Sequence, residues 1–378
     1  MIESFNYEVE RYMYKEVNYT QESIPVAVSA VTARIAATQK ENGEIPWSRD
    51  DKTDPWDHVE AAMGLTIGGD YARARQAYEW MRRTQLEDGS WYSAYRNGQP
   101  EDSTRDTNMA AYIAVGLYHY FLITGDDEFV ESMWATVRAA IEFVLKFQQP
   151  TGEIHWAMSP EGIIDPKALL TGSSSVYMSL KCAVSLARVL EKAHTGWVAA
   201  LMRLKDAIAN RPHLFDRTKS RFSMDGFYPV LTGAVTGEKA RQRIDTCLVK
   251  FFVAGQGVKC VSDEPWITIA ETSELCLTIA ATGNRKRAAR IFELLQDYRY
   301  PDGSYWCGFT IPERTIWPEE KVSWTNAVVL MAADAIYRLT PAAGLFDHDF
   351  WKNAGRSAGP QIASAGDLET SVPAAVNF

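Results

Sequence analysis

The 378-residue sequence contains few cysteines, and they form no pattern that would build a disulfide framework or a metal site. There are five of them, an odd number, widely spaced and without a Cys-x-x-Cys pair, which argues against paired disulfides and structural zinc. Reduced thiols of this kind are typical of the cytoplasm, so we predict a cytoplasmic location.

Long apolar runs and clusters of basic residues are also missing. No segment approaches the roughly 18 uninterrupted apolar residues of a membrane span, and the N-terminal stretch has no apolar core of a signal peptide. The formal net charge of −9, without any Lys/Arg-rich run, disfavours a nucleic-acid partner. We therefore expect a small-molecule partner and no transmembrane segment, while peripheral membrane contact and the oligomeric state stay open.

Strand-type alternation of apolar and polar residues is nearly absent, whereas a turn motif recurs along the chain. Gln-x-x-x-Gly-x-apolar occurs at 39–45, 85–91 and 148–154, with a looser copy at 300–306. A second mark, Thr-Gly or Gly-Gly, occurs at 68–70, 124–126, 195–197, 236–238 and 282–284. Glycine at such positions suits the end of a helix, where a left-handed residue is needed. The two marks alternate and divide the chain into helical hairpins.

The helices between these marks are of two kinds. Segments such as 58–68, 108–123, 174–190, 228–235, 268–281 and 324–339 are mostly uncharged, whereas 71–83 and 285–298 carry a charged stripe. A helix that is apolar all round is buried, and a striped helix faces water. We predict an all-α (α/α)6 toroid with inner and outer rings in a single domain, 1–350, followed by a flexible tail, 351–378. A helical solenoid is the alternative.

The stretch TQLEDGSW at 84–91 resembles the QW motif of terpenoid cyclases. The resemblance implies membership of the terpenoid cyclase and protein prenyltransferase superfamily, in which the motif's Gln caps a helix and its Trp stacks on neighbouring backbone. It also implies a structural role for the motif, so the chemistry is expected at the N-termini of the inner helices. Those N-termini converge on one mouth and favour negative charge.

Acidic residues gather at these predicted helix starts. Asp57 and Asp106 occupy positions that suit helix caps, whereas Glu60 and Glu271 lie within apolar helices, where burial raises the pKa of a carboxyl group. We predict these four acids as catalytic candidates and His58 as a residue that orients or activates them.

One stretch of the sequence departs from the motif that class II cyclases share. Class II cyclases protonate an alkene with the middle Asp of Asp-x-Asp-Asp-Thr, but the matching stretch at 103–108 has Ser103 and Arg105 in place of the first Asp and the acid. Arg105 is expected to hold a substrate carboxylate or to tune a neighbouring acid.

No cofactor is predicted. Asp50-Asp51-Lys-Thr-Asp54 matches the magnesium-diphosphate motif of class I prenyl enzymes, but it precedes Pro55 in an expected loop. Asp245 and Cys247, with His348, are a weak match to the zinc ligands of protein prenyltransferases, on an expected outer helix.

Aromatic residues are abundant, with 12 Trp, 17 Tyr and 15 Phe, and several stand at inner-helix starts, which predicts an aromatic-lined cavity. The predicted substrate-binding residues are Arg105, Asn108, Trp56, Trp91, Tyr228, Trp266, Trp306 and Trp324. One interpretation is a class II-like cyclase of a polyprenyl or prenylated-aromatic substrate, whose cationic intermediates the rings would stabilise. The alternative is a glycan-active six-hairpin hydrolase or lyase that pairs Asp57 or Glu60 with Glu271. A binding toroid without chemistry is the third.

Overall fold

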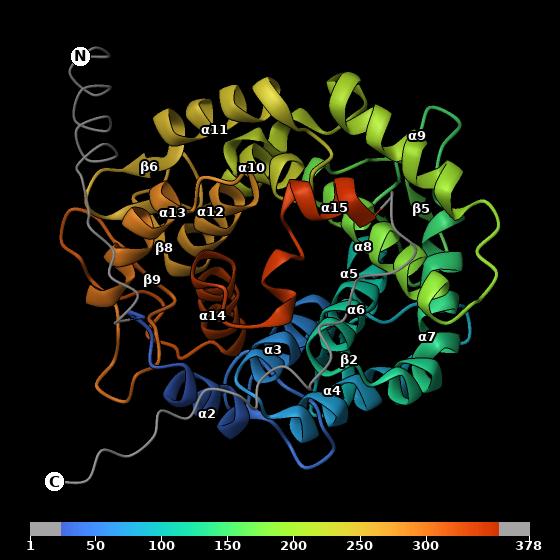
Figure 1. Cartoon of the computed structure of the whole chain (residues 1–378), viewed down its shortest axis with the longest axis horizontal. Helices are drawn as coiled ribbons and strands as arrows, with labels where there is room; N and C mark the ends of the chain where they lie inside the picture. Colours follow the sequence, from blue (N-terminus) through green and yellow to red (C-terminus); the bar gives the residue numbers. More distant parts are fainter. Residues whose placement is uncertain (1–23, 355–378) are drawn as a thin grey trace, which may run out of the picture.

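The computed structural model describes residues 24–354, whose helices form two concentric rings (Figure 1). The inner ring comprises α3 (Pro55–Ile67), α5 (Thr107–Ala111) with α6 (Ile113–Thr124), α8 (Leu170–Val189), α10 (Ser223–Leu231), α12 (Ile269–Ala281) and α14 (Ser323–Tyr337). The outer ring comprises α2 (Val28–Thr38), α4 (Tyr71–Thr84), α7 (Asp127–Leu145), α9 (Trp197–Asn210), α11 (Gly237–Phe251) and α13 (Arg285–Phe292). The predicted (α/α)6 toroid is confirmed.

Burial of the two rings follows the sequence pattern. All 13 residues of α12 are buried, whereas α11 buries only one face, with Ala240, Ile244, Cys247, Leu248 and Phe251. An inner helix is covered by neighbours on every side, so it keeps few charged positions, and those that remain are candidates for function.

The Gln-x-x-x-Gly turns join neighbouring hairpins. The amide nitrogen of Gln85 donates to Gly89 O in its own turn (2.9 Å) and to Thr136 O in α7 (2.9 Å). Gln39 and Gln148 make the same two kinds of bond, to helices α4 and α9. The motif therefore has the structural role that the sequence predicted.

Trp91 belongs to this joint and not to a cavity. Its side chain is only 1% exposed, and its indole N–H donates to Met81 O at 2.9 Å. The ring is thus engaged within the protein, and the predicted substrate-binding role of Trp91 has no support in this geometry and stays a prediction.

Glycine is required at these turns for two reasons. Gly89 has φ of +97°, and a Cβ built there would lie 2.2 Å from Ala139 O in the adjacent outer helix. Gly43 and Gly152 combine a positive φ with the same close approach to backbone. The fourth copy closes the ring, because Gly303 approaches Ala30 in α2 and Arg34 Nε donates to Asp302 O at 3.2 Å.

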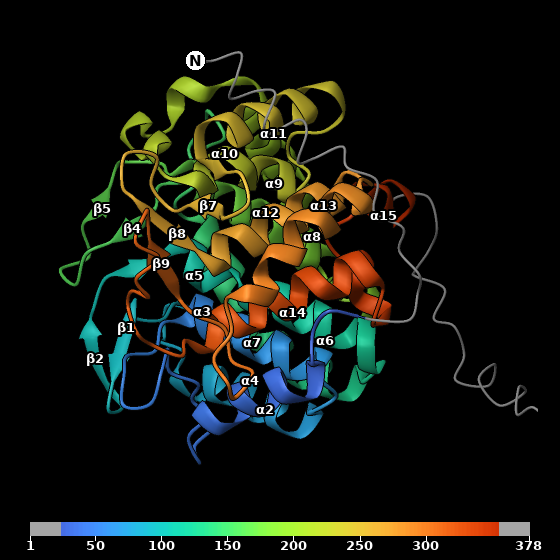
Figure 2. The same cartoon turned by 90° about the vertical axis from the view of Figure 1, so that its left-hand side faces the viewer.

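Short antiparallel strands, which the sequence pattern did not reveal, decorate one face of the toroid (Figure 2, left). They form the pair β1 (Ala94–Arg96) and β2 (Gln99–Asp102); the sheet β3 (Arg105–Asp106), β4 (Ala157–Met158) and β5 (Ile164–Asp165); and the sheet β6 (Phe252–Val253), β7 (Gly257–Lys259), β8 (Trp266–Thr268) and β9 (Gly308–Thr310). Segments of two to four residues are too short to show a period of two. This face carries the N-termini of the inner helices, and we call it the mouth.

Helix α15 (His348–Ala354) covers the opposite opening (Figures 1 and 2). The ammonium of Lys181 in α8 lies 4.2 Å from the Trp351 ring centroid, and His348 Nε2 lies 2.7 Å from Val230 O. Short 3₁₀ helices complete the fold: η1 (Pro212–Leu214), η2 (Arg217–Arg221), η3 (Glu293–Asp297) and η4 (Pro341–Gly344).

The predicted boundaries, 1–350 and 351–378, stay a prediction. Helix α15 continues to Ala354, past the first of these boundaries, and the rest of the predicted tail lies outside the described residues. No helix within 24–354 has the length and apolar character needed to cross a membrane.

Replacing Gly89 by Ala tests the joint between hairpins. We expect Gly89→Ala to cost at least about 2 kcal/mol more stability than Gly98→Ala, because both positions have positive φ but only Gly89 contacts a neighbouring backbone. Chemical denaturation of the two variants measures the difference. Equal losses would show that the close approach does not constrain the fold.

Candidate active site

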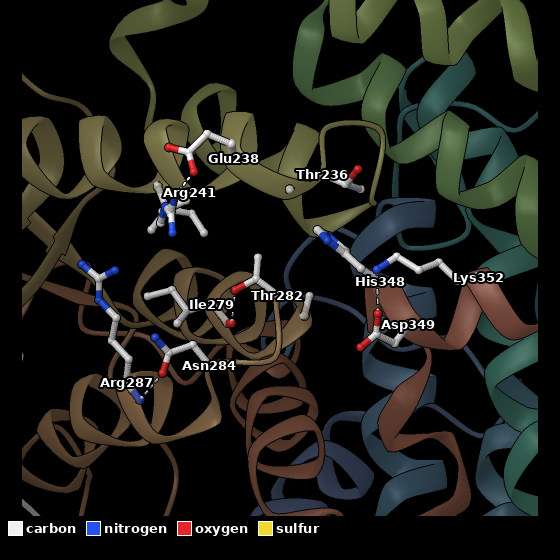
Figure 3. Close-up of a pocket in the computed structure, with 13 residues that line it drawn as sticks. Thr236, Glu238, Arg241, Ile279, Thr282, Asn284, Arg287, His348, Asp349 and Lys352 are labelled. Atoms are coloured by element: carbon white, nitrogen blue, oxygen red, sulfur yellow. Dashed lines mark hydrogen bonds and ion pairs between the residues drawn. The ribbon is translucent and has the colours of Figure 1, made fainter.

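Two cavities lie at opposite faces of the toroid. One, of about 460 Å³, opens beside α15 and is lined by α11, α15 and the turn between α12 and α13 (Figure 3). Its charges are paired, as Arg241 with Glu238, Arg287 with Asp245, and Lys352 with Asp349. It contains none of the predicted catalytic acids, so we place the candidate active site at the mouth.

The mouth cavity has a volume of about 250 Å³ and mostly apolar walls. Its apolar residues are Trp56, Met109, Ile154, Trp156, Leu169, Phe222 and Met224, and its polar residues include Asp106, Asn108, Thr171, Ser173 and Asp225. Asn108 Oδ1 and Ser173 Oγ are buried and have no hydrogen-bond partner among the described residues, which leaves them available to a ligand.

The start of α3 positions the first group of acids. Asp54 caps this helix: one oxygen accepts the Asp57 N–H at 2.9 Å, and the other accepts the Trp47 indole N–H at 2.6 Å. Pro55 follows at the first helical position, where its fixed φ favours the helix. Asp57 is left half-buried in the first turn, close to the other acids.

Asp57 is a carboxyl group that favours its protonated form. Burial raises its pKa well above the usual range, and the nearby carboxyls of Asp54 and Glu60 raise it further. A neutral carboxylic acid in a cleft is the form that a general acid requires.

A deeper pair of acids lies beneath, on α3 and α12. Glu60 Oε1 accepts the Trp56 indole N–H at 2.9 Å and the Tyr112 hydroxyl at 3.2 Å. Glu274 Oε1 accepts the Tyr228 hydroxyl at 2.5 Å. Burial raises the pKa of Glu60 to about 8, and burial followed by the Glu60 charge raises that of Glu274 well above its usual range.

The three aromatic side chains that donate hydrogen bonds to Glu60 and Glu274 also pack against one another beneath the mouth. The Trp56 ring centroid lies 5.6 Å from that of Tyr112 and 5.8 Å from that of Tyr228. Trp56 lines the mouth cavity, whereas Tyr228 is buried, and the binding roles of both stay predictions. Glu60 is buried and accepts two hydrogen bonds at Oε1, and its catalytic role likewise stays a prediction.

Glu271, on the next turn of α12 toward the mouth, keeps a free oxygen. The residue is 7% exposed, and its buried Oε2 has no partner among the described residues. Burial and then the charges of Glu271, Glu320 and Asp57 raise the pKa of the Cys307 thiol to about 12. Glu271 and Asp57 belong to the two helices that pack on either side of α14.

Two further predicted residues, Asp106 and Arg105, lie at the mouth but are engaged with the protein. Asp106 caps α5, accepting the N–H groups of Asn108 (2.7 Å) and Met109 (3.2 Å); burial raises its pKa to about 6. Arg105 pairs with Asp88 at 3.1 Å and donates to Ser159 O at 2.9 Å. Both brace the cavity wall, and their predicted catalytic and binding roles stay predictions.

His58 is a core residue whose ring nitrogens contact backbone groups, and its predicted role beside the acids stays a prediction. Its side chain is fully buried, its Nδ1 accepts the Ile45 N–H at 3.0 Å, and its Nε2 lies 3.0 Å from Ala77 O. Burial lowers the pKa of the imidazole, which fits a neutral ring that bridges two backbone groups.

The remaining aromatic predictions lie on the far side of the mouth. Trp306 packs on Tyr298 (5.5 Å between centroids), and Trp324 packs on Trp47 (6.3 Å). Trp266 packs on Trp317 (5.1 Å). None of these three predicted residues lines the 250 Å³ cavity, so their binding roles stay predictions.

Sequence reasoning did not assign Asp54, Tyr112, Asp225 or Glu274 to the site. Two signals were present: Asp54 precedes Pro55 at a helix start, and Glu274 follows Glu271 by three residues, on the same face of a helix. Asp225, whose Oδ1 accepts the Thr171 hydroxyl at 2.8 Å, gave no signal, because nothing local marks its partner in α8.

Among residues 24–354, no cluster of three or more His, Cys, Asp or Glu side chains could hold a metal ion. In the magnesium-like motif, Asp51 binds Arg96 at 3.1 Å and Asp54 caps α3. In the zinc-like set, Asp245 pairs with Arg287 and His348 contacts Val230 O. The expectation that the protein needs no cofactor stays a prediction.

Comparison with known proteins assigns the chain to a family. No family model matches the chain. Over 312 residues it is 47% identical to the MMP endo-(1,4)-3-O-methyl-alpha-D-mannosidase of Mycolicibacterium hassiacum, an alignment that covers 82% of this chain and 86% of that protein. The chain belongs to this mannosidase's family. It is also 24% identical over 241 residues to an uncharacterized glycosyl hydrolase of Methanocaldococcus jannaschii, covering 61% of this chain and 38% of that protein.

Solved structures show the same fold. A wild-type glycosidase superimposes with a TM-score of 0.66 at 15% identity, covering 86% of this chain and all of that one. A D-mannose isomerase superimposes with a TM-score of 0.65 at 9% identity, covering 85% of this chain and all of that one. Because the identities are low, these likenesses concern architecture alone.

The family corrects the terpenoid interpretation. The protein is an enzyme whose family is that of a mannosidase, so the predicted terpenoid cyclase family, isoprenoid substrate and cyclisation chemistry are wrong. The QW-like motif misled because its Gln and Gly solve a packing problem between helical hairpins, and a glycosidase toroid has the same problem. The cytoplasmic location stays a prediction.

The raised pKa of Glu60 predicts a pH-dependent effect of Glu60→Gln. The folded protein keeps this proton up to about pH 8, whereas the unfolded chain releases it near its ordinary pKa of about 4.3, so the wild type loses stability as the pH rises between these values. We expect the melting temperature of Glu60→Gln, relative to the wild type, to rise steadily from pH 5 to pH 9. A difference independent of pH would contradict the buried, protonated Glu60.

Proposed function

We propose that the protein is an endo-acting glycosidase that hydrolyses glycans of (1,4)-linked 3-O-methyl-α-D-mannose. The observation that carries this proposal is the 47% identity with an enzyme named for that activity, over most of both chains. The proposal is supported by the buried acids at the starts of α3 and α12, since glycoside hydrolysis needs a pair of carboxyl groups, and by the mouth cavity, whose lining includes Trp56 of α3.

In this proposal Asp57 is the general acid. Its raised pKa keeps the proton available at neutral pH for the glycosidic oxygen, which leaves as a hydroxyl group. Glu271 is the second carboxylate, and it acts on the anomeric carbon directly or by taking a proton from the attacking water. Asp54 is a positioning residue, because its two hydrogen bonds fix the turn that carries Asp57.

The walls of the mouth cavity suit a methylated sugar. A methyl ether replaces a hydroxyl donor by an apolar group, which favours burial against carbon and not against a hydrogen-bond acceptor. Met109, Leu169 and Met224 supply such surface, while Asn108 and Ser173 present unpaired polar atoms for the remaining hydroxyls.

The activity is tested by incubating the protein with a 3-O-methylmannose oligosaccharide and with its unmethylated counterpart. Mass spectrometry of the products should show cleavage at internal linkages and faster turnover of the methylated substrate. Release of single sugars from one end, or interconversion of free sugars without cleavage, would overturn the proposal.

Asp57→Asn and Glu271→Gln should each lower kcat about 10²–10⁴-fold with the fold intact, because each removes one proton-transfer or nucleophilic group. Steady-state kinetics measures the loss, and melting temperature checks the fold. Glu142→Gln, an isosteric change at an exposed position of α7, serves as the control and should keep wild-type kcat. Near-normal turnover of either active-site variant would remove that residue from its role.

A further inference from the structure

An aromatic pair stands on the mouth face outside the 250 Å³ cavity. Trp317 is 56% exposed, and its ring meets that of Trp266 edge to face, with centroids 5.1 Å apart and planes at 76°. Trp317 is thus a large apolar ring presented to solvent, whereas most other large aromatic side chains of the described residues are buried or packed in the core.

The backbone of Trp317 is fixed on two sides. Its N–H donates to Gly308 O in β9 at 2.9 Å, and its carbonyl accepts the Trp266 indole N–H at 2.7 Å. Gly308 leaves room for this arrangement, since a Cβ there would lie 2.6 Å from Trp266 Nε1. Because its backbone is fixed in this way, Trp317 has only side-chain freedom left to lose when a ligand binds its ring.

The aromatic pair of Trp266 and Trp317 is connected along the chain to the helix that carries two of the acids. Trp266 opens β8, which passes directly into α12, the helix that carries Glu271 and Glu274. The mouth cavity lies over the starts of α3, α5, α8 and α10, whereas β8 and β9 lie over α12 and α14 (Figure 2). The acids of α12 therefore directly follow the strand that carries Trp266, and Asp57 on α3 directly follows the cavity residue Trp56.

An endo-acting enzyme must bind its glycan on both sides of the bond that it cleaves. The cavity supplies one side, and the other side needs a surface for sugar rings. A tryptophan face packs against the C–H face of a pyranose and leaves the sugar hydroxyls in water. Such a surface requires no charge, in keeping with a neutral glycan.

We propose that Trp317, supported by Trp266, is a distal sugar-binding platform that takes a hexose unit of the glycan on the side of the acids opposite to the mouth cavity. This inference rests on the proposed function. From strand and helix rises, Trp266 stands roughly 10–15 Å along the chain path from Glu271, so only substrates that extend beyond the cleaved bond reach the platform.

Trp317→Ala tests the platform through chain length. For a long 3-O-methylmannose oligosaccharide we expect KM to rise about tenfold with kcat unchanged, which corresponds to about 1.4 kcal/mol of lost binding. For the shortest substrate that is still cleaved, neither constant should change. Trp317→Tyr keeps an aromatic face and should restore most of the affinity.

Met202→Ala is the matched control, because Met202 is 57% exposed on outer helix α9, away from the mouth. It should leave KM unchanged for both substrates, and melting temperatures should show that all variants remain folded. If Trp317 had a merely structural role, Trp317→Ala would change KM for both substrates alike, and Trp317→Tyr would not restore the affinity.

The outcomes separate the platform from the proposed function. If the wild type cleaves no glycan of any length, the proposed function fails. If the wild type cleaves both substrates but Trp317→Ala binds the long one normally, the platform is wrong and the endo-mannosidase proposal stands. A dimer that Trp317→Ala dissociates, with KM unchanged, would show that the ring is instead a contact between copies of the chain.

Discussion

The amide of the turn glutamine is the interaction on which the toroid depends. Each such amide bonds its own turn and the backbone of the adjacent outer helix, and the glycine four residues later lets the two backbones touch. Because the contact is between backbones, it sets the spacing of hairpins independently of the side chains around it. The inner helices then start at one face, where their free N–H groups and positive dipole ends favour carboxylates such as Asp54 and Asp106.

The acids at that face lie at two depths and differ in their hydrogen-bond partners. Hydrogen bonds from Trp56, Tyr112 and Tyr228 hold the deeper carboxyls of Glu60 and Glu274, which burial keeps protonated. Nearer the mouth, burial and the neighbouring acids raise the pKa of Asp57, and the buried Oε2 of Glu271 has no hydrogen-bond partner among the described residues. Burial first, and then repulsion among the acids, favours the protonated form of a carboxyl group at this face.

The toroid and its inner helices were predictable because their signals are local: apolar segments, glycine at helix ends and acids at helix starts. The pair proposed here as catalytic, Asp57 and Glu271, followed from the same signals as a hypothesis. Burial of Trp91 agrees with the structural role predicted for its motif, whereas burial of His58 was not predictable, because it depends on which hairpin lies alongside; the strands were too short to show a period. The predicted substrate class was wrong for a different reason. TQLEDGSW indicates how helical hairpins pack against one another and carries no information about the ligand of the cavity.

The ring closes where the first and last helical elements meet. Helix α14 packs between α3 and α12, and the Ser323 hydroxyl donates to Pro46 O at 2.7 Å across that seam. Asp57 and Glu271 come from the two helices that flank α14, so their separation is set only when the contact most distant in sequence has formed. A partly closed ring would keep nearly all its helices but would leave Asp57 and Glu271 without a fixed separation. If these two acids act as proposed, catalytic activity reports complete folding of this protein more sensitively than its helical content does.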